Sequence, residues 1–239
     1  MASKFEYARA YCSDHVKAND EDRWLAAQYA PAKDCRRLLA LYALQCELRR
    51  IPSLVSEPPL GEIRLQWWRE ALHEIHEGGS LRAHPVVEEF AEAGLAHQRF
   101  APMIERVIDA NARALYGEGF ADIADLTDWL ALTDGAIDAI AVQLLGGDDA
   151  LASHAAHAGS AFALAREGRA LAPALADAIG ARAVAIAIEA APILQKAAAK
   201  TAPALLHISL TRLYARHGAK SFALYRRARL FAAMAFGRF

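Results

Sequence analysis

The chain has 239 residues with a formal net charge of −1, and its 55% hydrophobic content is enough to bury a substantial core. Residues 1–11 carry charges instead of the apolar run of a signal peptide, and no stretch approaches the ~20 apolar residues that span a bilayer. The three cysteines have no metal-ligand spacing. We therefore expect a reducing cytoplasmic location, because secreted proteins are usually stabilised by disulfides.

Charge is distributed unevenly along the chain. After Glu189 there are nine basic residues and no acidic one, whereas residues 1–189 hold 18 basic and 28 acidic residues. A basic end favours an anionic partner such as a phospholipid surface or a diphosphate. The alternative is neutralisation by the protein's own acidic part, and the sequence leaves both open.

Helical periodicity dominates the first half of the chain. Pro31 is expected to begin a helix that runs to about Leu48, and Pro59 another that ends at Gly78-Gly79. The second of these has an apolar face with 3–4–3 spacing, formed by Leu65, Trp68, Leu72 and Ile75. His84-Pro85 and Pro102 begin two further helices.

A long helix is predicted from Asp122 to Leu145, bent near Gly135 and stopped by Gly146-Gly147. Prolines and glycines divide the Ala-rich remainder into about four short helices. The dividing residues are Pro173, Gly180, Pro192, Pro203 and Gly218. We predict an all-α fold, a single bundle of about ten antiparallel helices forming one domain over residues 1–239.

Several stretches together resemble the squalene/phytoene synthase family over about residues 5–170, leaving 171–239 as basic Ala-rich helices. They are Tyr29-Ala30-Pro31, Arg36, Leu41-Tyr42-Ala43-Leu44, Trp68-Arg69-Glu70, His84-Pro85-Val86, Thr133-Asp134-Gly135, Leu144-Leu145-Gly146, His157, Gly159, Ala161 and Arg169. The resemblance implies an isoprenoid (terpenoid) synthase-like fold. It also implies head-to-head joining of isoprenoid diphosphates, with Mg²⁺ held by two Asp-rich motifs on facing helices.

The chain departs from that pattern at both motifs. Arg49, Arg50 and Ser53 stand at the acidic positions of the first motif, and Ala170 replaces an Asp of the second, leaving Glu167 as one carboxylate. Each cation at ~4 Å would repel a unit positive charge by about 4 kcal/mol in an intermediate dielectric. We therefore predict no catalytic residue, no metal site and no cofactor.

The departures are similar to the non-catalytic branch of the family, which includes the mitochondrial complex I assembly factor. That branch shares a run represented here by Glu47, Ser56-Glu57, Gly61 and Trp67-Trp68. The resemblance implies a pseudoenzyme that binds an isoprenoid or lipid, or that helps assemble a membrane complex with a protein partner.

An anionic ligand would be bound by arginines, which chelate diphosphate without a metal. The predicted ligand-binding residues are Arg36, Tyr42, Arg49, Arg50, Arg166 and Arg169. The alternative for Arg49 and Arg50 is a solvated pair at a helix end.

Two other functions stay open. One is an active prenyltransferase whose rearranged Mg²⁺ site uses Glu47, Asp134, Asp138 or Glu167. The other is a helical adaptor without a cavity ligand.

The basic, aromatic stretch 225–231 is typical of segments that lie peripherally on anionic membranes, but a final bundle helix with a basic outer face is the simpler explanation. Without a recognised module, the basic patch does not favour nucleic-acid binding.

Overall fold

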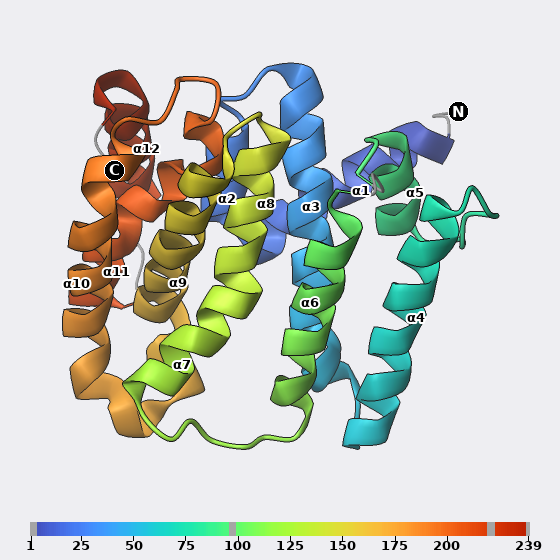
Figure 1. The fold of residues 1–239 in the computed structure, drawn as a ribbon, viewed down its shortest axis with the longest axis horizontal. Coiled ribbons are helices and arrows are strands. Elements are labelled where there is room, and N and C mark those ends of the chain that lie inside the picture. Colours follow the sequence, from blue (N-terminus) through green and yellow to red (C-terminus); the bar gives the residue numbers. More distant parts are fainter. Residues whose placement is uncertain (1–3, 96–98, 219–222, 238–239) are drawn as a thin grey trace. The chain divides into compact units, whose positions relative to one another are not determined.

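The structure is a computed structural model that describes residues 4–95, 99–218 and 223–237 (Figure 1). Every regular element in those ranges is a helix, which confirms the predicted all-α class. The helices form two compact units, one made of residues 1–24 and 31–118 and the other of residues 25–30 and 119–239. The single domain over residues 1–239 stays a prediction.

In the N-terminal unit, α1 packs against α3 and α5, and α4 packs against α6. The bounds are α1 Lys4–Asn19, α3 Ala32–Arg50, α4 Pro58–His76, α5 Pro85–Glu92 and α6 Ala101–Asn111. The helix α2, Glu21–Ala27, contains the point at which the chain passes from one unit to the other.

In the C-terminal unit, α9 packs against α8, α10 and α11. The bounds are α7 Ile123–Leu130, α8 Ala136–Leu144, α9 Asp149–Leu171, α10 Ala176–Leu194, α11 Thr211–His217 and α12 Ala223–Phe236. A short 3₁₀ segment, Leu206–Leu210, precedes α11.

Most predicted helix starts are confirmed, because proline and capping residues mark them. Pro31 directly precedes α3, and α4 begins at Pro58, one residue before the predicted start. The Nδ1 atom of His84 accepts a hydrogen bond from the Val86 amide, so this side chain caps α5. Asp148 caps α9 in the same way through the Leu151 amide.

The long helix predicted from Asp122 to Leu145 is present as α7 and α8, joined by a π-helical segment, Ala131–Gly135. That segment lies against α9 at very short range. A Cβ atom on Gly135 would lie 2.2 Å from the Ala156 carbonyl oxygen, and one on Gly159 would lie 2.2 Å from the Oδ2 atom of Asp138. The two glycines therefore allow α8 and α9 to approach closely.

The prediction for the C-terminal third is partly wrong. Gly180 does not end a helix, because α10 runs through it and through Pro192 to Leu194. Gly180 lies inside the helix where a Cβ atom would be 3.0 Å from the Ala215 carbonyl oxygen. It is thus a packing residue, and a glycine alone does not mark a helix end.

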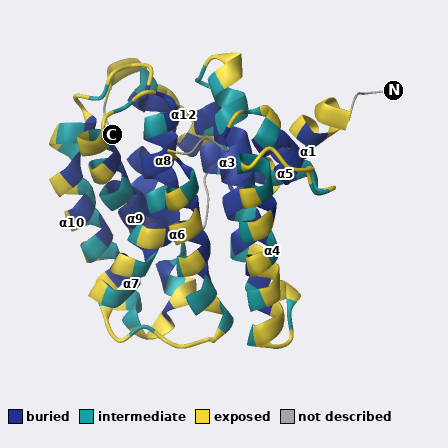
Figure 2. Cartoon of the chain, turned by 45° about the vertical axis from the view of Figure 1, so that its right-hand side comes forward, coloured by how far each residue is buried: buried dark blue, intermediate teal, exposed yellow. Residues whose placement is uncertain are grey.

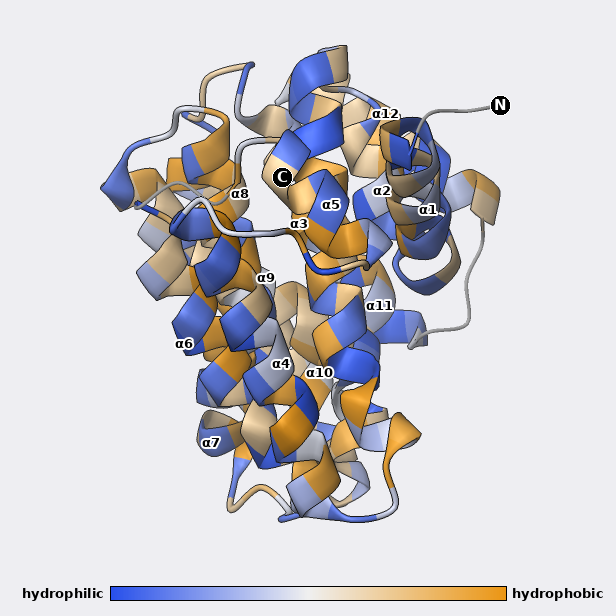
Figure 3. Cartoon of the chain, turned by 90° about the vertical axis from the view of Figure 1, so that its right-hand side faces the viewer, coloured by the Kyte–Doolittle hydropathy of each residue, from blue (hydrophilic) through white to orange (hydrophobic). Residues whose placement is uncertain are grey.

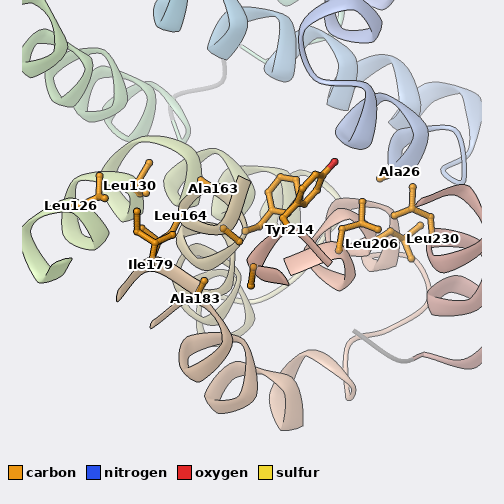
Figure 4. Packing of buried hydrophobic residues seen from close by; sticks show 14 of the residues in the cluster. Ala26, Leu126, Leu130, Ala163, Leu164, Ile179, Ala183, Leu206, Tyr214 and Leu230 are labelled. Carbon is orange, nitrogen blue, oxygen red and sulfur yellow. The ribbon is translucent and has the colours of Figure 1, made fainter. Parts of the chain in front are cut away.

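Buried residues concentrate along α3 and α9, as Figure 2 shows. The core of the C-terminal unit is drawn in Figure 4, where side chains from several helices meet. They include Leu126, Leu130, Ala163, Leu164, Ile179, Ala183, Leu206, Tyr214 and Leu230. Burying each Leu or Ile side chain contributes about 1.5–3 kcal/mol.

Among the helices that the structure describes, none is by itself long and apolar enough to cross a membrane. Two consecutive segments, Asp149–Leu171 and Pro173–Leu194, are together long and apolar enough, but they are bent by 117° relative to each other.

Candidate functional site

The end of α3 in the N-terminal unit holds the positions at which the resemblance places the first acidic motif. Arg50 is the last residue of α3, and its Nη1 atom lies 3.2 Å from the Oε1 atom of Glu47, one helical turn earlier. The Ser53 hydroxyl donates to the Arg50 carbonyl oxygen at 2.7 Å. Arg49 is half-buried. The carboxylate nearest this motif is thus already bound by an arginine.

Glu47 is also contacted from α1. The Tyr11 hydroxyl donates to its Oε1 atom at 3.2 Å, and the Nε2 atom of His15 lies 3.2 Å from the same oxygen. Tyr11 and His15 are four residues apart on one face of α1, and their rings stack with centroids 5.5 Å apart. The Glu47 side chain is 7% exposed, so these contacts hold a nearly buried carboxylate.

A pocket of about 360 Å³ opens beside this cluster. We call it the Trp pocket, and it is lined by Glu47, Arg50, Ile51, Leu54, Ile63, Arg64, Trp67, Trp68 and His84. The Trp67 and Trp68 rings meet edge to face at 5.1 Å, and the His84 ring lies 5.0 Å from that of Trp68. The wall of the Trp pocket is therefore largely aromatic.

The tryptophans occupy two faces of α4, as their adjacent positions predicted. Trp68 is buried, whereas Trp67 is half-buried. Figure 3 shows hydrophilic and hydrophobic residues interspersed along α4, and the buried ones, Gly61, Leu65, Trp68 and Ala71, recur at helical spacing.

Burial controls protonation around the pocket. Desolvation lowers the pKa of His15 and of His84 below the ordinary histidine value, although Glu47 opposes both shifts. Desolvation, with Glu47 second, raises the pKa of the Tyr11 hydroxyl. Near neutral pH the two histidines are therefore uncharged. The charges lining the Trp pocket are Glu47, Arg50 and Arg64.

These donors do not fit Mg²⁺. The ion prefers an octahedron of oxygen ligands and usually binds one or two carboxylates. Glu47 is the one carboxylate that lines the Trp pocket, and its Oε1 atom already faces Arg50. The arrangement suits an anion with an apolar body instead, because two arginines flank an aromatic wall.

Arg36 and Tyr42, also predicted to bind ligand, are engaged elsewhere in the N-terminal unit. Arg36 donates two hydrogen bonds to Glu89, at 2.5 Å from Nε and 2.9 Å from Nη2. Glu89 is 1% exposed, so Arg36 neutralises a buried carboxylate. The Tyr42 ring is buried under the Arg23 guanidinium, 5.7 Å from its centroid. Ligand binding by either residue stays a prediction.

Arg166 and Arg169 lie on α9 in the C-terminal unit. The Nη2 atom of Arg166 lies 2.6 Å from the Oε1 atom of Glu167, and its guanidinium stacks over the Phe162 ring at 4.7 Å. The Nη2 atom of Arg169 donates to the Ala215 carbonyl oxygen at 3.0 Å. The structure does not bring these arginines together with those on α3, and a shared ligand stays a prediction.

The Asp134 and Asp138 carboxylates, candidates for a rearranged metal site, are both buried. The Oδ2 atom of Asp138 lies 3.2 Å from the Nε2 atom of His207, and both side chains are 0% exposed. The His207 ring also meets the Phe162 ring edge to face at 4.8 Å. Within the ranges that the structure describes, no group of three or more His, Cys, Asp or Glu side chains could hold a metal ion.

The sequence missed four members of these clusters, Tyr11, His15, His84 and His207. The spacing of Tyr11 and His15 indicates that they share one helix face, but no local sequence pattern predicts their contacts with Glu47. His84 was read as a helix start and its ring contacts were not foreseen. His207 reaches Asp138 across 69 positions of sequence, a separation that no motif encodes.

The sequence profile of squalene/phytoene synthases matches residues 16–178, which is more than half of the chain. The chain belongs to the squalene/phytoene synthase family. Curated proteins similar to this chain include complex I assembly factors. NADH dehydrogenase (ubiquinone) complex I, assembly factor 6 from Mus musculus is 28% identical over 152 residues, covering 63% of this chain and 45% of the relative. The Homo sapiens protein of that name is 26% identical over the same coverage.

The Drosophila melanogaster homolog is 25% identical over 170 residues, covering 69% of this chain and 51% of the relative. This family member thus spans about half the length of the curated relatives it matches.

Solved structures support the fold. A dehydrosqualene synthase in complex with ligand has a TM-score of 0.72 at 15% identity, covering 97% of this chain and 96% of its own. Squalene synthase HpnC from Alicyclobacillus acidocaldarius has a TM-score of 0.69 at 14% identity, covering 99% and 97%. The terpenoid synthase-like fold implied by the sequence is therefore confirmed.

Proposed function

We propose that this chain is a non-catalytic squalene/phytoene synthase family protein. It serves in the assembly of a membrane complex and binds an isoprenoid or similar lipid-like anion in the Trp pocket. The observation that carries this proposal is the charge arrangement at the end of α3. There Glu47 is bound by Arg50 inside an aromatic pocket that also holds Arg64. Such a site favours an anionic head on an apolar body and disfavours a divalent metal.

The state of the other carboxylates supports the same proposal. The rearranged metal site would use Glu47, Asp134, Asp138 or Glu167. Three of these, Glu47, Asp138 and Glu167, contact a basic or imidazole partner within their own unit. A carboxylate held by an arginine would have to lose that partner before it could ligate Mg²⁺. This requirement counts against the active prenyltransferase, which we keep as the second candidate.

The assembly role rests on the relatives, whose names describe assembly factors for NADH dehydrogenase complex I. Because this chain covers about half of their length, their role is transferred here as a proposal and includes a protein partner. A peripheral position at a membrane, through the basic C-terminal helices, belongs to the same proposal. The cytoplasmic location stays a prediction.

Catalysis is tested by incubating the pure protein with Mg²⁺ and farnesyl or geranylgeranyl diphosphate and measuring the diphosphate released. We expect none above the rate without protein. Release that an Asp134→Ala change abolishes would overturn the non-catalytic assignment in favour of the second candidate.

Ligand binding is tested separately by titrating farnesyl diphosphate without Mg²⁺ and following tryptophan fluorescence. We expect saturable quenching, weakened in Arg64→Gln because one cation of the Trp pocket is lost. Arg106→Gln removes an exposed arginine of α6 that does not line the pocket, and it should leave the affinity unchanged. Equal loss in both variants, or no quenching in the unmodified protein, would refute the pocket's role.

A further inference from the structure

A second, strongly basic groove lies in the C-terminal unit between α11 and α12. It has a volume of about 770 Å³ and is lined by Ser209, Arg212, Leu213, Arg216, His217, Leu224, Tyr225 and Arg229. We call it the α11–α12 groove. Both helices belong to the orange and red end of the chain in Figure 1. Among the described residues that line it, three are arginines and none is acidic, so their combined potential is positive.

The arginines of the groove are available to a ligand. Arg212 and Arg216 are exposed and form no ion pair or hydrogen bond with any residue that the structure describes. Arg229 is half-buried, and its Nε atom donates to the Ser209 carbonyl oxygen at 3.3 Å. That contact fixes the guanidinium at the groove while its terminal nitrogens stay without a described partner. Arginines placed in this way bind phosphate oxygens.

The Ser209 hydroxyl gives a second and independent indication of a ligand. Ser209 is 6% exposed and lines the groove, and its Oγ atom has no hydrogen-bond partner among the described residues. A buried hydroxyl without a partner destabilises a protein, so such atoms are rare. A phosphate oxygen seated among the arginines would supply the missing partner.

The surface of α12 indicates what carries the phosphate. The helix buries Leu230 and Ala233 in the core, which agrees with a final helix packed on the rest of its unit. Met234 is half-buried against the same core, whereas four other large apolar side chains are exposed to solvent. They are Leu224 at 83%, Tyr225 at 56%, Phe231 at 63% and Phe236 at 71%. A helix that exposes aromatic and basic residues together is typical of one that lies at a membrane interface.

We propose that the α11–α12 groove binds the phosphate of an anionic phospholipid headgroup, while the exposed apolar residues of α12 enter the bilayer interface. Arg212, Arg216 and Arg229 hold the phosphate oxygens, and the Ser209 hydroxyl donates to one of them. This inference rests on the proposed membrane association and names the residues responsible for it. It assigns the contact to a defined groove, whereas a diffuse basic surface would involve all the C-terminal basic residues alike.

The test measures the partition of the protein onto vesicles of phosphatidylcholine with and without phosphatidylglycerol. Arg212→Gln combined with Arg216→Gln is compared with Arg182→Gln combined with Arg227→Gln. The second pair removes the same charge from the same unit outside the groove. At ~1 kcal/mol per basic residue, or about five-fold, we expect the groove pair to lose about thirty-fold in partition onto anionic vesicles. The control pair should lose less than about five-fold.

Ser209→Ala separates a binding role from a structural one. Removing an unpaired buried hydroxyl should raise the melting temperature of the lipid-free protein. It should also lower the partition onto anionic vesicles about five-fold, because one hydrogen bond of ~1 kcal/mol to the phosphate is lost. A higher melting temperature with unchanged partition would exclude Ser209 from the site.

The remaining outcomes are distinct. Equal losses in the groove and control pairs would overturn the groove and leave a diffuse basic surface. No preference of the unmodified protein for anionic vesicles would overturn the membrane association itself. If inorganic phosphate raises the melting temperature of the unmodified protein but not of the groove pair, and vesicles do not bind, the source of the phosphate is a soluble ligand instead of a lipid.

Discussion

Replacing Asp138 by alanine should destabilise the protein strongly. Its Oδ2 atom lies 3.2 Å from the Nε2 atom of His207, and both side chains are fully buried. The Nδ1 atom of His207 has no hydrogen-bond partner in the described ranges. Removing the Asp138 carboxylate would leave the Nε2 atom without its Asp138 contact as well. Removing one member of such a buried pair costs about 3–5 kcal/mol. For a chain of this size that lowers the melting temperature by roughly 6–20 °C.

The sign of this effect separates two roles for Asp138. Two neighbouring carboxylates of a metal site without its metal repel each other, so removing one would stabilise the protein. If Asp138 instead serves as the hydrogen-bond partner of His207, its removal destabilises the protein. Urea unfolding followed by circular dichroism measures the difference, and Asp138→Asn, which keeps the shape, should lose only ~1 kcal/mol because it forfeits the charge of the acceptor.

Asp128→Ala is the matched control, because Asp128 is exposed on α7, and it should change stability by less than about 0.5 kcal/mol. A loss below ~1 kcal/mol for Asp138→Ala, or a gain, would refute the reasoning. So would a melting temperature of the unmodified protein that rises on adding Mg²⁺.

Three further predictions concern packing, a buried ion pair and pH. Gly135→Ala should destabilise the protein by about 1–3 kcal/mol despite the higher helix propensity of alanine, because the added Cβ atom would lie 2.2 Å from a backbone oxygen. Gly119→Ala is the control: its Cβ atom meets open space, and urea unfolding should show little change in stability. Arg36→Ala should cost about 3–5 kcal/mol by leaving the buried Glu89 unpaired, and thermal unfolding that shows no loss would favour a ligand role over this structural one. Because burial lowers the pKa of His84, this side chain binds a proton more readily in the unfolded chain than in the folded protein. The contribution of His84 to the free energy of unfolding is therefore fully present above pH ~6.5 and falls at lower pH, by up to ~1.4 kcal/mol per pH unit. The His84→Asn variant should reduce that slope while keeping the helix cap.

The sequence predicted the fold well wherever a local rule decides the structure. Pro31 directly precedes α3, and the side chains of His84 and Asp148 accept a hydrogen bond from a first-turn amide of α5 and α9. The predicted helix end at Gly180 was wrong, because a glycine inside a helix can also allow close packing. Only the folded structure shows that the Ala215 backbone lies against Gly180. Tertiary packing here overrides the low helix propensity of glycine.

The site was predictable in its charge but not in its partners. The family resemblance places Arg49 and Arg50 at acidic positions of the first motif. The hydrogen bonds of Glu47 to Tyr11 and Arg50 were not predicted, because one partner comes from another helix and side-chain geometry decides the other. For the same reason Arg36 was predicted to bind ligand while its contact with Glu89 was unforeseen.

Under the proposed loss of catalysis, a simple deletion of acidic residues would leave solvated carboxylates, whereas two carboxylates of this chain each contact a basic or imidazole side chain. Glu47 is bound by Arg50, and Asp138 is matched to His207. In each pair the partner stabilises a carboxylate that would otherwise be buried without one, which agrees with the proposal that no metal is needed there. If the proposal holds, synthase chemistry would require removal of these partners as well as new carboxylates at Arg49, Arg50 and Ala170, and no single substitution accomplishes that.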